Sequence, residues 1–286
     1  METKSQFGHY LITRFNLRKE NWTTTKSNEP VLTDVWLKNR FELFEMYCLP
    51  SVKAQSNKNF EWLIFFDTTT PDEYKERISK IATNFPQFKP VYSDGMDPYI
   101  GMAQDIVAHC ESPYIITTRL DNDDCVSVDF IDTIQSDFTS QEYECLDYVD
   151  GYTLQIVPKV RLGEKLHYYN PFNSLVEKND QPKTVLHRRH SQWKKEKRIN
   201  RIRGKRIWLS IIHFENKVNE FNGYGNMDWD VVMDKFCVEP AKLAELKEEK
   251  MSFGKWRLVS WINFIDIRVT YFFKDLKRNI GLYGNH

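Results

Sequence analysis

An apolar stretch that runs directly into three carboxylates constrains this chain more than any other feature. Residues 114–120 read Tyr-Ile-Ile-Thr-Thr-Arg-Leu, and the carboxylates that follow within four positions are Asp121, Asp123 and Asp124. The β-branched residues favour an extended chain, and Pro113 marks the point where the strand begins. Three like charges so close together destabilise a fold unless a positive charge lies between them.

This acidic segment predicts a metal site at the edge of a parallel sheet. Hard divalent cations such as Mg²⁺ and Mn²⁺ bind carboxylate oxygens. In open α/β sheets, ligands bind outside the carboxyl ends of the strands, which is where Asp121 and Asp123 would lie. The alternative is a solvated turn in which Asp124 or Ser127 caps a following helix. The apolar strand before the segment and the helical pattern after it favour the metal site.

Composition excludes several classes of protein. Of the 286 residues, 41% are hydrophobic and 28% are charged, and 40 basic residues balance 40 acidic ones. This balance argues against a nucleic-acid partner. The five cysteines, at positions 48, 110, 125, 145 and 237, show no Cys-x-x-Cys spacing, which argues against a zinc site or a disulfide framework. With no apolar leader and no long apolar run, we expect a cytoplasmic protein.

The first half of the chain alternates strand and helix patterns, as α/β domains do. Strand patterns cover residues 10–13, 60–66, 88–92 and 114–120, and helical patterns cover residues 34–47, 71–82 and 100–110. Strands that alternate with helices pair in parallel through right-handed crossovers. Their carboxyl ends would therefore bring Arg14, Asp67 and Asp94 to the same edge as the acidic segment.

After residue 140 the pattern changes to strands without long helices between them. Strand patterns cover residues 148–157, 159–168 and 206–212. Gly151 indicates a bend or bulge in the first of these, and the second could pair with it across Gly163. The third strand ends at His213.

Residues 183–206 have the most unusual charge in the chain. They include 11 Lys or Arg residues and a single acid, Glu196, so their local charge is +10 and the rest of the chain carries −10. A block of this kind is usually a solvated loop or helix face. The functional alternative is an arm that grips phosphate or another polyanion. Trp193 is its only aromatic residue, which weakens the case for stacking on nucleobases.

Residues 256–278 predict an amphipathic helix. Its apolar stripe consists of Trp256, Val259, Trp261, Ile262, Phe264, Ile265, Val269, Phe272, Phe273 and Leu276. The basic residues around it are Lys255, Arg257, Arg268, Lys274, Lys277 and Arg278. Most such helices pack on their own domain. An interfacial membrane helix or a dimer contact fits the same pattern.

Three motifs, in this order and at this spacing, together resemble the bacterial "putative rhamnosyltransferase" family of GT-A glycosyltransferases. They are Tyr10-Leu11-Ile12-Thr13-Arg14-Phe15-Asn16, Thr118-Arg119-Leu120-Asp121-Asn122-Asp123-Asp124, and Trp208-Leu209-Ser210-Ile211-Ile212-His213 followed by Asn216. The resemblance spans roughly residues 7–220. The Arg-Leu-Asp-Asn-Asp-Asp segment is the most specific of the three.

The resemblance implies a fold and a division of the chain. The fold is α/β, with a GT-A Rossmann-like, mostly parallel sheet flanked by helices, an acceptor-side α+β region and a C-terminal amphipathic helix. The glycosyltransferase domain would span residues 7–220, with a nucleotide-binding half at 7–138 and an acceptor half at 139–220 that contains the basic arm. Residues 221–286 would form a C-terminal helical extension.

The resemblance also assigns roles to individual residues. In GT-A enzymes an Asp-x-Asp pair holds a divalent metal on the diphosphate of a sugar nucleotide, and here that pair is Asp121 and Asp123. Asp123 would ligate Mn²⁺ or Mg²⁺ directly, Asp121 would face the ribose or the metal's water shell, and His213 would complete the metal shell. The residues expected to face the nucleotide-sugar donor are Arg14, Asp67, Asp94, Arg119 and Asp121. Arg119 or the basic arm would stabilise the leaving diphosphate through charge-assisted hydrogen bonds.

The expected reaction moves a sugar, with rhamnose suggested by the family name, from a nucleotide-diphosphate sugar to a glycan or glycoconjugate acceptor. If the reaction inverts the anomeric centre, the acceptor hydroxyl needs a general base. Glu177 is the first candidate for this base and Asp150 the second. Either could instead be a structural carboxylate that caps a helix or pairs with a base.

Two other functions compete with this one. A nucleotidyltransferase also uses paired carboxylates, but commonly has a Gly-rich loop after the first strand, where this chain has Arg14-Phe15-Asn16. A non-catalytic module could bind an acidic glycan or membrane through residues 183–206, but such a module would not need to keep the acidic triad. We expect no nucleic-acid partner. A peripheral contact with the inner face of an anionic membrane is an alternative that the sequence leaves open, as it does the oligomeric state.

Overall fold

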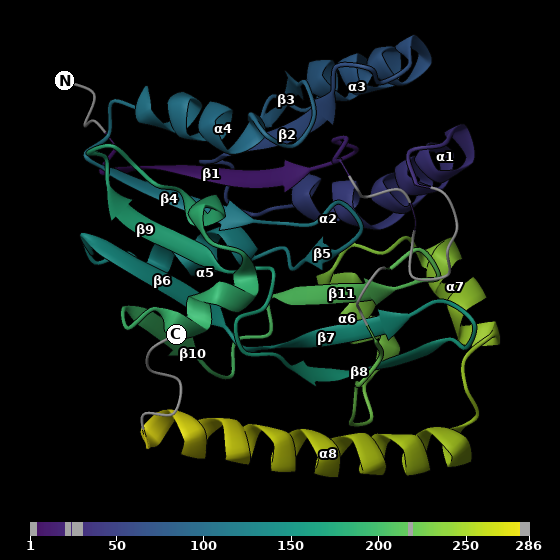
Figure 1. The fold of residues 1–286 in the computed structure, drawn as a ribbon. Helices are drawn as coiled ribbons and strands as arrows, with labels where there is room; N and C mark the ends of the chain where they lie inside the picture. The colour runs from purple at the N-terminus through teal and green to yellow at the C-terminus, as the bar shows by residue number, and fades with distance from the viewer. Residues whose placement is uncertain (1–4, 21–23, 25–30, 217–219, 281–286) are drawn as a thin grey trace.

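The computed structural model describes residues 5–20, 24, 31–216 and 220–280. They form two β-sheets with helices packed on their faces, and a long helix, α8 (Phe253–Asn279), lies along one side of the molecule (Figure 1). The α/β class with a mostly parallel central sheet is therefore confirmed.

The larger sheet has seven strands in the order β10-β6-β9-β4-β1-β2-β3. Its parallel part consists of β1 (Phe7–Arg14), β2 (Glu61–Asp67), β3 (Phe88–Ser93) and β4 (Tyr114–Arg119). It is completed by β6 (Tyr143–Tyr148), β9 (Ser174–Lys178) and β10 (Ile199–Ile202). Because β9 runs antiparallel between β4 and β6, strands from both predicted halves share this sheet. The division at residue 139 stays a prediction.

A smaller sheet has four strands in the order β5-β11-β7-β8. These are β5 (Cys125–Val126), β11 (Trp208–Ile212), β7 (Asp150–Gln155) and β8 (Arg161–Leu166). The predicted pairing across Gly163 is confirmed, since β7 and β8 are antiparallel with Thr153 opposite Gly163. The strand predicted at 148–157 corresponds mainly to β7, and its first residue, Tyr148, is instead the last residue of β6 in the larger sheet. Gly151 allows a close approach, because a Cβ there would lie 2.3 Å from the Trp208 ring.

The helices lie largely where the sequence predicts them. They are α1 (Asp34–Leu43), α2 (Leu49–Lys53), α3 (Asp72–Asn84), α4 (Tyr99–Ala108), α5 (Phe130–Ser136), α6 (Trp229–Lys235) and α7 (Pro240–Glu248). A π-helical turn, η1 (Phe44–Cys48), joins α1 to α2, so the helical segment continues past Pro50 rather than ending before it. Pro50 sits in the first turn of α2, where a proline is tolerated.

Buried side chains pack on both faces of the larger sheet. Successive strand residues point to opposite faces, so Leu11 joins the core under α1 and α3 while Ile12 joins the core under α4. The segment 183–206, which is rich in basic residues, was expected to be solvated. Its apolar residues Val185, Leu186 and Trp193 are instead buried in the core under α4. This segment forms two short 3₁₀ turns, η2 (Val185–His187) and η3 (His190–Lys195), and then the edge strand β10.

Candidate active site

The acidic turn after β4 is tied to the end of β1. The side-chain amide of Asn122 donates to the carbonyl oxygens of Arg14, at 3.2 Å, and Phe15, at 3.1 Å. The backbone N–H of Leu120 donates to the carbonyl of Ile12 at 3.1 Å. The carboxyl ends of β1 and β4 therefore form one rigid edge that carries the three aspartates.

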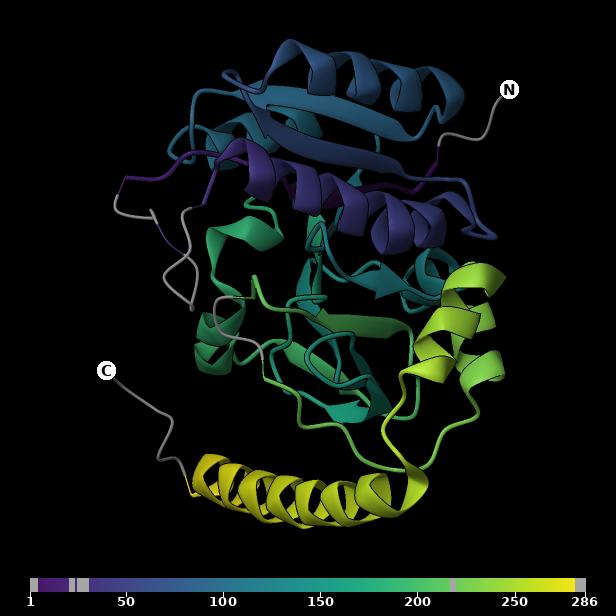
Figure 2. The same cartoon turned by 90° about the vertical axis from the view of Figure 1, so that its right-hand side faces the viewer.

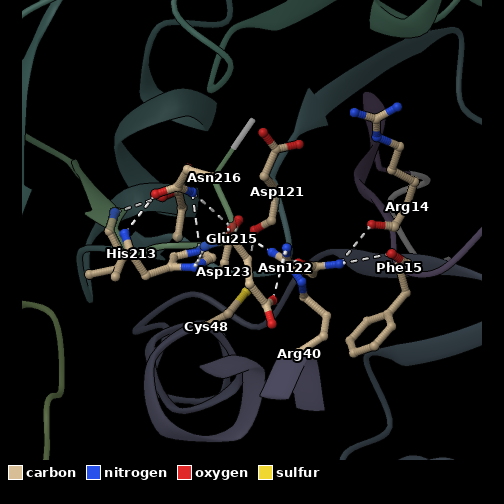
Figure 3. A network of polar contacts seen from close by, with 12 residues as sticks. Arg14, Phe15, Arg40, Cys48, Asp121, Asn122, Asp123, His213, Glu215 and Asn216 are labelled. Atoms are coloured by element: carbon tan, nitrogen blue, oxygen red, sulfur yellow. Dashed lines mark hydrogen bonds and ion pairs between the residues drawn. The ribbon is translucent and has the colours of Figure 1, made fainter. Parts of the chain in front are cut away.

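Asp123 is the centre of a buried polar cluster (Figure 3). Its Oδ2 atom lies 2.6 Å from Arg40 Nη1 and 2.9 Å from His213 Nε2. Arg40 Nη2 lies 3.6 Å from Glu215 Oε2, so the guanidinium sits between two carboxylates. Burial alone would raise the pKa of Asp123, but the charge of Arg40 and the contact with His213 outweigh it and hold that pKa well below its usual range. Asp123 is therefore an ionised carboxylate at neutral pH.

Asp124 has a structural role. It is buried, and its Oδ1 accepts the backbone N–H of Ile211 at 2.8 Å, which joins the turn after β4 to β11. Burial and the charges of Asp123 and Asp121 raise the pKa of Asp124 well above its usual value. It does not cap a helix, because α5 begins at Phe130 with Asp129 before it.

Asp121 faces a different set of partners. Its side chain is only partly buried, and in Figure 3 its carboxylate lies outside the hydrogen-bonded network around Asp123. Its charge acts instead on Arg119 and on His190, which both also experience the charge of Arg14. His190 belongs to η3, and Arg119 Nη2 donates to the Arg188 carbonyl at 3.4 Å. The basic segment thus folds back onto the carboxyl ends of β1 and β4 and places His190, whose pKa is lowered by burial, near Asp121.

Asp67 and Asp94 converge on Arg18 rather than on Asp123. Asp67 accepts the Arg18 backbone N–H at 2.9 Å and its Nε at 2.8 Å, and Asp94 pairs with Nη2 of the same guanidinium. Burial raises the pKa of Asp67, but hydrogen bonds from Arg18 and Thr69 outweigh this and lower it overall. The predicted donor-binding residues therefore form two groups at the sheet edge, one around Asp121 and one around Arg18.

The first predicted general base, Glu177, does not reach this edge. It lies opposite Ile115 at the start of β4, roughly 20 Å of extended chain away from Asp121. Its carboxylate accepts the backbone N–H groups of Lys183, at 2.9 Å, and Thr184, at 2.8 Å. Because β9 runs antiparallel to β4, Glu177 falls at the wrong end of the sheet, where it anchors the basic segment.

The second predicted base, Asp150, is also placed away from the cluster. It begins β7, whereas His213 follows β11 beside the other end of β7. Its carboxylate accepts the backbone N–H of Gly204 at 2.7 Å and lies 3.7 Å from Arg203 Nη1. The contacts of Asp150 are those of a structural carboxylate that holds the segment between β10 and β11.

A cleft of about 730 Å³ opens beside the cluster. His213 and Asn216 form its wall next to Asp123, and Glu220 is the carboxylate among its described lining residues. Arg161 lies 4.2 Å over the ring of Phe221, another lining residue. The cleft thus combines an aromatic ring, a guanidinium and a carboxylate, which suits a hydroxyl-rich ligand.

The predicted metal ligands are only partly brought together. Asp123 and His213 are in contact, but in the described part of the chain no three His, Cys, Asp or Glu side chains are grouped to hold a metal ion. Magnesium is commonly bound by one or two carboxylates together with substrate phosphates and waters. The Asp123–His213 pair therefore fits a hard divalent ion whose remaining ligands come from a bound phosphate, and such an ion would share Asp123 with Arg40.

Arg40 and Glu215 are the residues of the cluster that the sequence interpretation missed. Arg40 lies on the buried face of α1 with Trp36, Leu37 and Phe41. A basic residue inside a helical apolar stripe is a signal that could have identified it, because a buried charge requires a partner. Glu215 has no comparable local signal.

The family described as "Putative rhamnosyl transferase" matches residues 8–223. No curated protein matches the chain. Among solved structures, S. aureus TarS 1–349 matches at 13% identity and a TM-score of 0.42, with 71% of this chain and 60% of that chain covered. Its complex with UDP-GlcNAc matches at 11% identity and a TM-score of 0.45, with 84% and 70% covered. A structure described as a putative nucleotide-diphospho-sugar transferase from Desulfovibrio desulfuricans G20 matches at 8% identity and a TM-score of 0.42, with 87% and 100% covered.

Proposed function

The chain belongs to the putative rhamnosyl transferase family and is a glycosyltransferase, and we propose that it takes its sugar from a nucleotide-diphosphate donor, with rhamnose as the first candidate. The acceptor is a glycan or glycoconjugate. The observation that carries this proposal is the buried cluster of Asp123, Arg40 and His213, which joins the carboxyl ends of β4 and β11. A buried cluster that contains the charges of Asp123 and Arg40 is costly to a fold and is typical of an active site.

The donor diphosphate would lie beside Asp121, against Arg14, Arg119 and His190. Arg14 is exposed at the end of β1, and Arg119 is partly buried at the end of β4. Guanidinium groups bind phosphate oxygens through paired, charge-assisted hydrogen bonds. When the bond between the sugar and the diphosphate breaks, negative charge develops on the leaving phosphate, and the guanidinium groups of Arg14 and Arg119 would stabilise it.

Asp123 and His213 are the residues that would hold Mn²⁺ or Mg²⁺ when the donor is bound. A divalent ion there would act as a Lewis acid toward the diphosphate. Arg40 would keep its contact with the same carboxylate and orient it, since its guanidinium is fixed by Glu215 on the other side.

The acceptor would enter the cleft beside His213. There Phe221 offers an aromatic face and Arg161 and Gln155 offer polar groups, joined by a hydrogen bond of 2.7 Å. In an inverting transfer, a base removes the acceptor hydroxyl proton while the oxygen attacks the anomeric carbon and the diphosphate leaves. We propose Glu220 as this base in place of Glu177 and Asp150, because it lines the cleft.

The variants Glu220→Gln and Glu177→Gln test whether Glu220 or Glu177 is the general base. Glu220→Gln should lower kcat by about a hundredfold or more, since a positioned base contributes on the order of 10²–10⁴. Glu177→Gln should keep kcat but lower the unfolding free energy by about 1–3 kcal/mol, because it weakens two buried backbone hydrogen bonds. Transfer kinetics and thermal melts on both proteins check this, and the reverse pattern would return the role to Glu177.

A donor screen tests the proposed function. Thermal shifts would be measured with UDP-, GDP- and dTDP-sugars, each with Mn²⁺, Mg²⁺ or EDTA. A donor well above its Kd should raise the melting temperature by roughly 5 °C, through mass action on the folded state. A rise in melting temperature that requires the metal supports the Mn²⁺ or Mg²⁺ site. An equal rise in EDTA would contradict the metal site but still support the donor. If no sugar nucleotide raises the melting temperature, the proposed donor is wrong. The next ligands would then be a nucleoside triphosphate and a sugar phosphate, the substrates of a nucleotidyltransferase.

A further inference from the structure

Helix α8 contacts the rest of the molecule along one narrow face. Trp256, Ile267 and Tyr271 are its buried side chains, and Asn263 Nδ2 donates to the Gly223 carbonyl at 2.8 Å. These positions repeat at the three- and four-residue spacing of a single helical face. Figures 1 and 2 show the helix at the outer edge of the molecule, along the side of the smaller sheet.

The opposite face of α8 is apolar and exposed. It is formed by Leu258, Trp261, Ile262, Ile265, Val269, Phe272, Phe273 and Leu276. Trp261 is 63% exposed and Phe272 is 65% exposed, so these large rings stand in solvent rather than in the core. At 1.5 Å per residue, the stripe from Leu258 to Leu276 is about 27 Å long. Contiguous apolar patches of this size on a protein surface mark an interaction site.

Basic residues flank this stripe on both sides. By helical geometry, Arg257 and Arg268 lie beside Trp261, and Lys277 lies beyond Phe273 on the other flank. Lys255 extends the second flank at the start of the helix. Two described acids lie on the flanks, Asp266 and Asp275, and Asp275 is already paired with Arg201 at 3.1 Å. The side chain of Arg278 lies outside the described part of the chain. The apolar stripe is therefore bordered by positive charge, while the whole chain is neutral.

We propose that α8 docks the protein on an anionic membrane surface, with its axis in the plane of the headgroups. Two properties of this face fit an anionic bilayer. Its aromatic rings can be buried among the acyl chains, and its basic side chains are attracted to the anionic headgroups. No helix of the described residues is long and apolar enough to cross a membrane, so this contact is peripheral.

A second copy of the chain is a poorer occupant of the same face. Pairing two α8 helices through their stripes would bring the basic flanks of both copies together. Like charges placed side by side repel, and Asp266 together with the already paired Asp275 does not balance the four flanking bases. A membrane with anionic lipids brings opposite charge to the same flanks.

Vesicle co-sedimentation of the full chain tests the proposal. The probes are vesicles of phosphatidylcholine alone and of phosphatidylcholine mixed with phosphatidylglycerol. The wild type should bind the anionic vesicles at least tenfold more tightly, and salt should weaken that binding. Arg257→Gln with Arg268→Gln should reduce binding to anionic vesicles by roughly twenty-fivefold, at about fivefold for each base. Trp261→Ser with Phe272→Ser should reduce it at least tenfold.

A matched control keeps the test decisive. Val231, on α6, is 66% exposed, so Val231→Ser removes surface apolar area away from α8 and should leave vesicle binding unchanged. Because all these side chains are exposed, the variants should melt within a few degrees of the wild type. The proposal is overturned if the wild type fails to bind anionic vesicles, or if the Trp261 and Phe272 variant binds them equally well. The proposal is also overturned if light scattering shows that the wild type and Val231→Ser are dimers while the Trp261 and Phe272 variant is a monomer. In that case α8 would be a contact between two copies of the chain.

Discussion

Asp123→Asn is expected to reduce sugar transfer by at least about a thousandfold. Asp123 is the residue on which Arg40 and His213 converge, at 2.6 Å and 2.9 Å from the same oxygen. The amide keeps the shape of the side chain but removes the charge that holds both partners. Loss of one preorganised group at a reacting centre costs on the order of 10²–10³ in kcat, and here the loss would disturb several groups at once. The measurement is kcat with the donor that the thermal-shift screen identifies.

The control for this variant is Asp72→Asn. Asp72 is 93% exposed at the start of α3, so the same chemical change there should leave kcat within twofold of the wild type, or about 0.4 kcal/mol in barrier height. A thermal melt of Asp123→Asn must show a folded protein at the assay temperature. If folded Asp123→Asn keeps more than about a tenth of the wild-type kcat, then the cluster supports the fold and the chemistry lies elsewhere.

Local sequence was enough to predict which residues lie at the carboxyl edge of the sheet, because this prediction needs only two general rules of α/β folds. Alternating strand and helix patterns give parallel strands, and parallel strands end on the same side. Arg14, Asp67 and Asp121 follow three separate strands, and the structure brings all three to that edge. The contact of His213 with Asp123, 90 positions earlier in the chain, came from the family resemblance and not from the pattern.

The general base could not be predicted in the same way. Whether β9 runs parallel or antiparallel to β4 depends on pairing between segments about 60 residues apart, as in the pair of Ile115 with Glu177. Residues 174–178 carry no local signal of their direction. A residue type suited to catalysis therefore fell at the amino end of β4, where two backbone N–H groups bind it.

The basic segment shows the same limit for electrostatics. Composition detected its charge of +10 but not the partners of that charge, which come from distant parts of the chain. Arg201 pairs with Asp275 at 3.1 Å, Lys205 with Asp137 at 3.0 Å and Arg206 with Glu164 at 2.9 Å. These pairs fix the later part of the segment against the body, and the part that meets the candidate active site is the earlier turn with His190.

The second large expected effect is that Arg40→Met makes the stability of the protein depend on Mn²⁺. Removing the guanidinium leaves Asp123 and Glu215 as two buried carboxylates without their shared cation. Breaking a buried ion pair on one side costs about 3–5 kcal/mol, which is roughly a 10 °C drop in melting temperature for a chain of this size. If Asp123 and His213 hold a divalent ion when the donor is bound, Mn²⁺ added together with the donor should replace the lost charge and restore most of that drop.

The measurement is a thermal melt of the variant in EDTA and in Mn²⁺, each with the donor that the thermal-shift screen identifies, beside Arg77→Met. Arg77 pairs with Glu45 but is 41% exposed, so its loss should cost no more than about 1 kcal/mol and should not respond to the ion. If Arg40→Met is destabilised equally in EDTA and in Mn²⁺, no divalent ion binds at Asp123 and the metal proposal fails, while the cluster keeps its role in holding the edge together.

Combining Arg40→Met with Asp123→Asn separates charge balance from chemistry. Because the two side chains are in contact, the effects of the two substitutions on the free energy of unfolding should not add. The loss in the double variant should be smaller than the two single losses added together, by about 1 kcal/mol or more. Two neutral side chains replace an ion pair there, so less uncompensated charge stays buried. Sugar transfer should nevertheless stay as low as in Asp123→Asn alone. Recovery of stability without recovery of transfer would mean that Arg40 balances the cluster and that the charge of Asp123 is what the reaction requires.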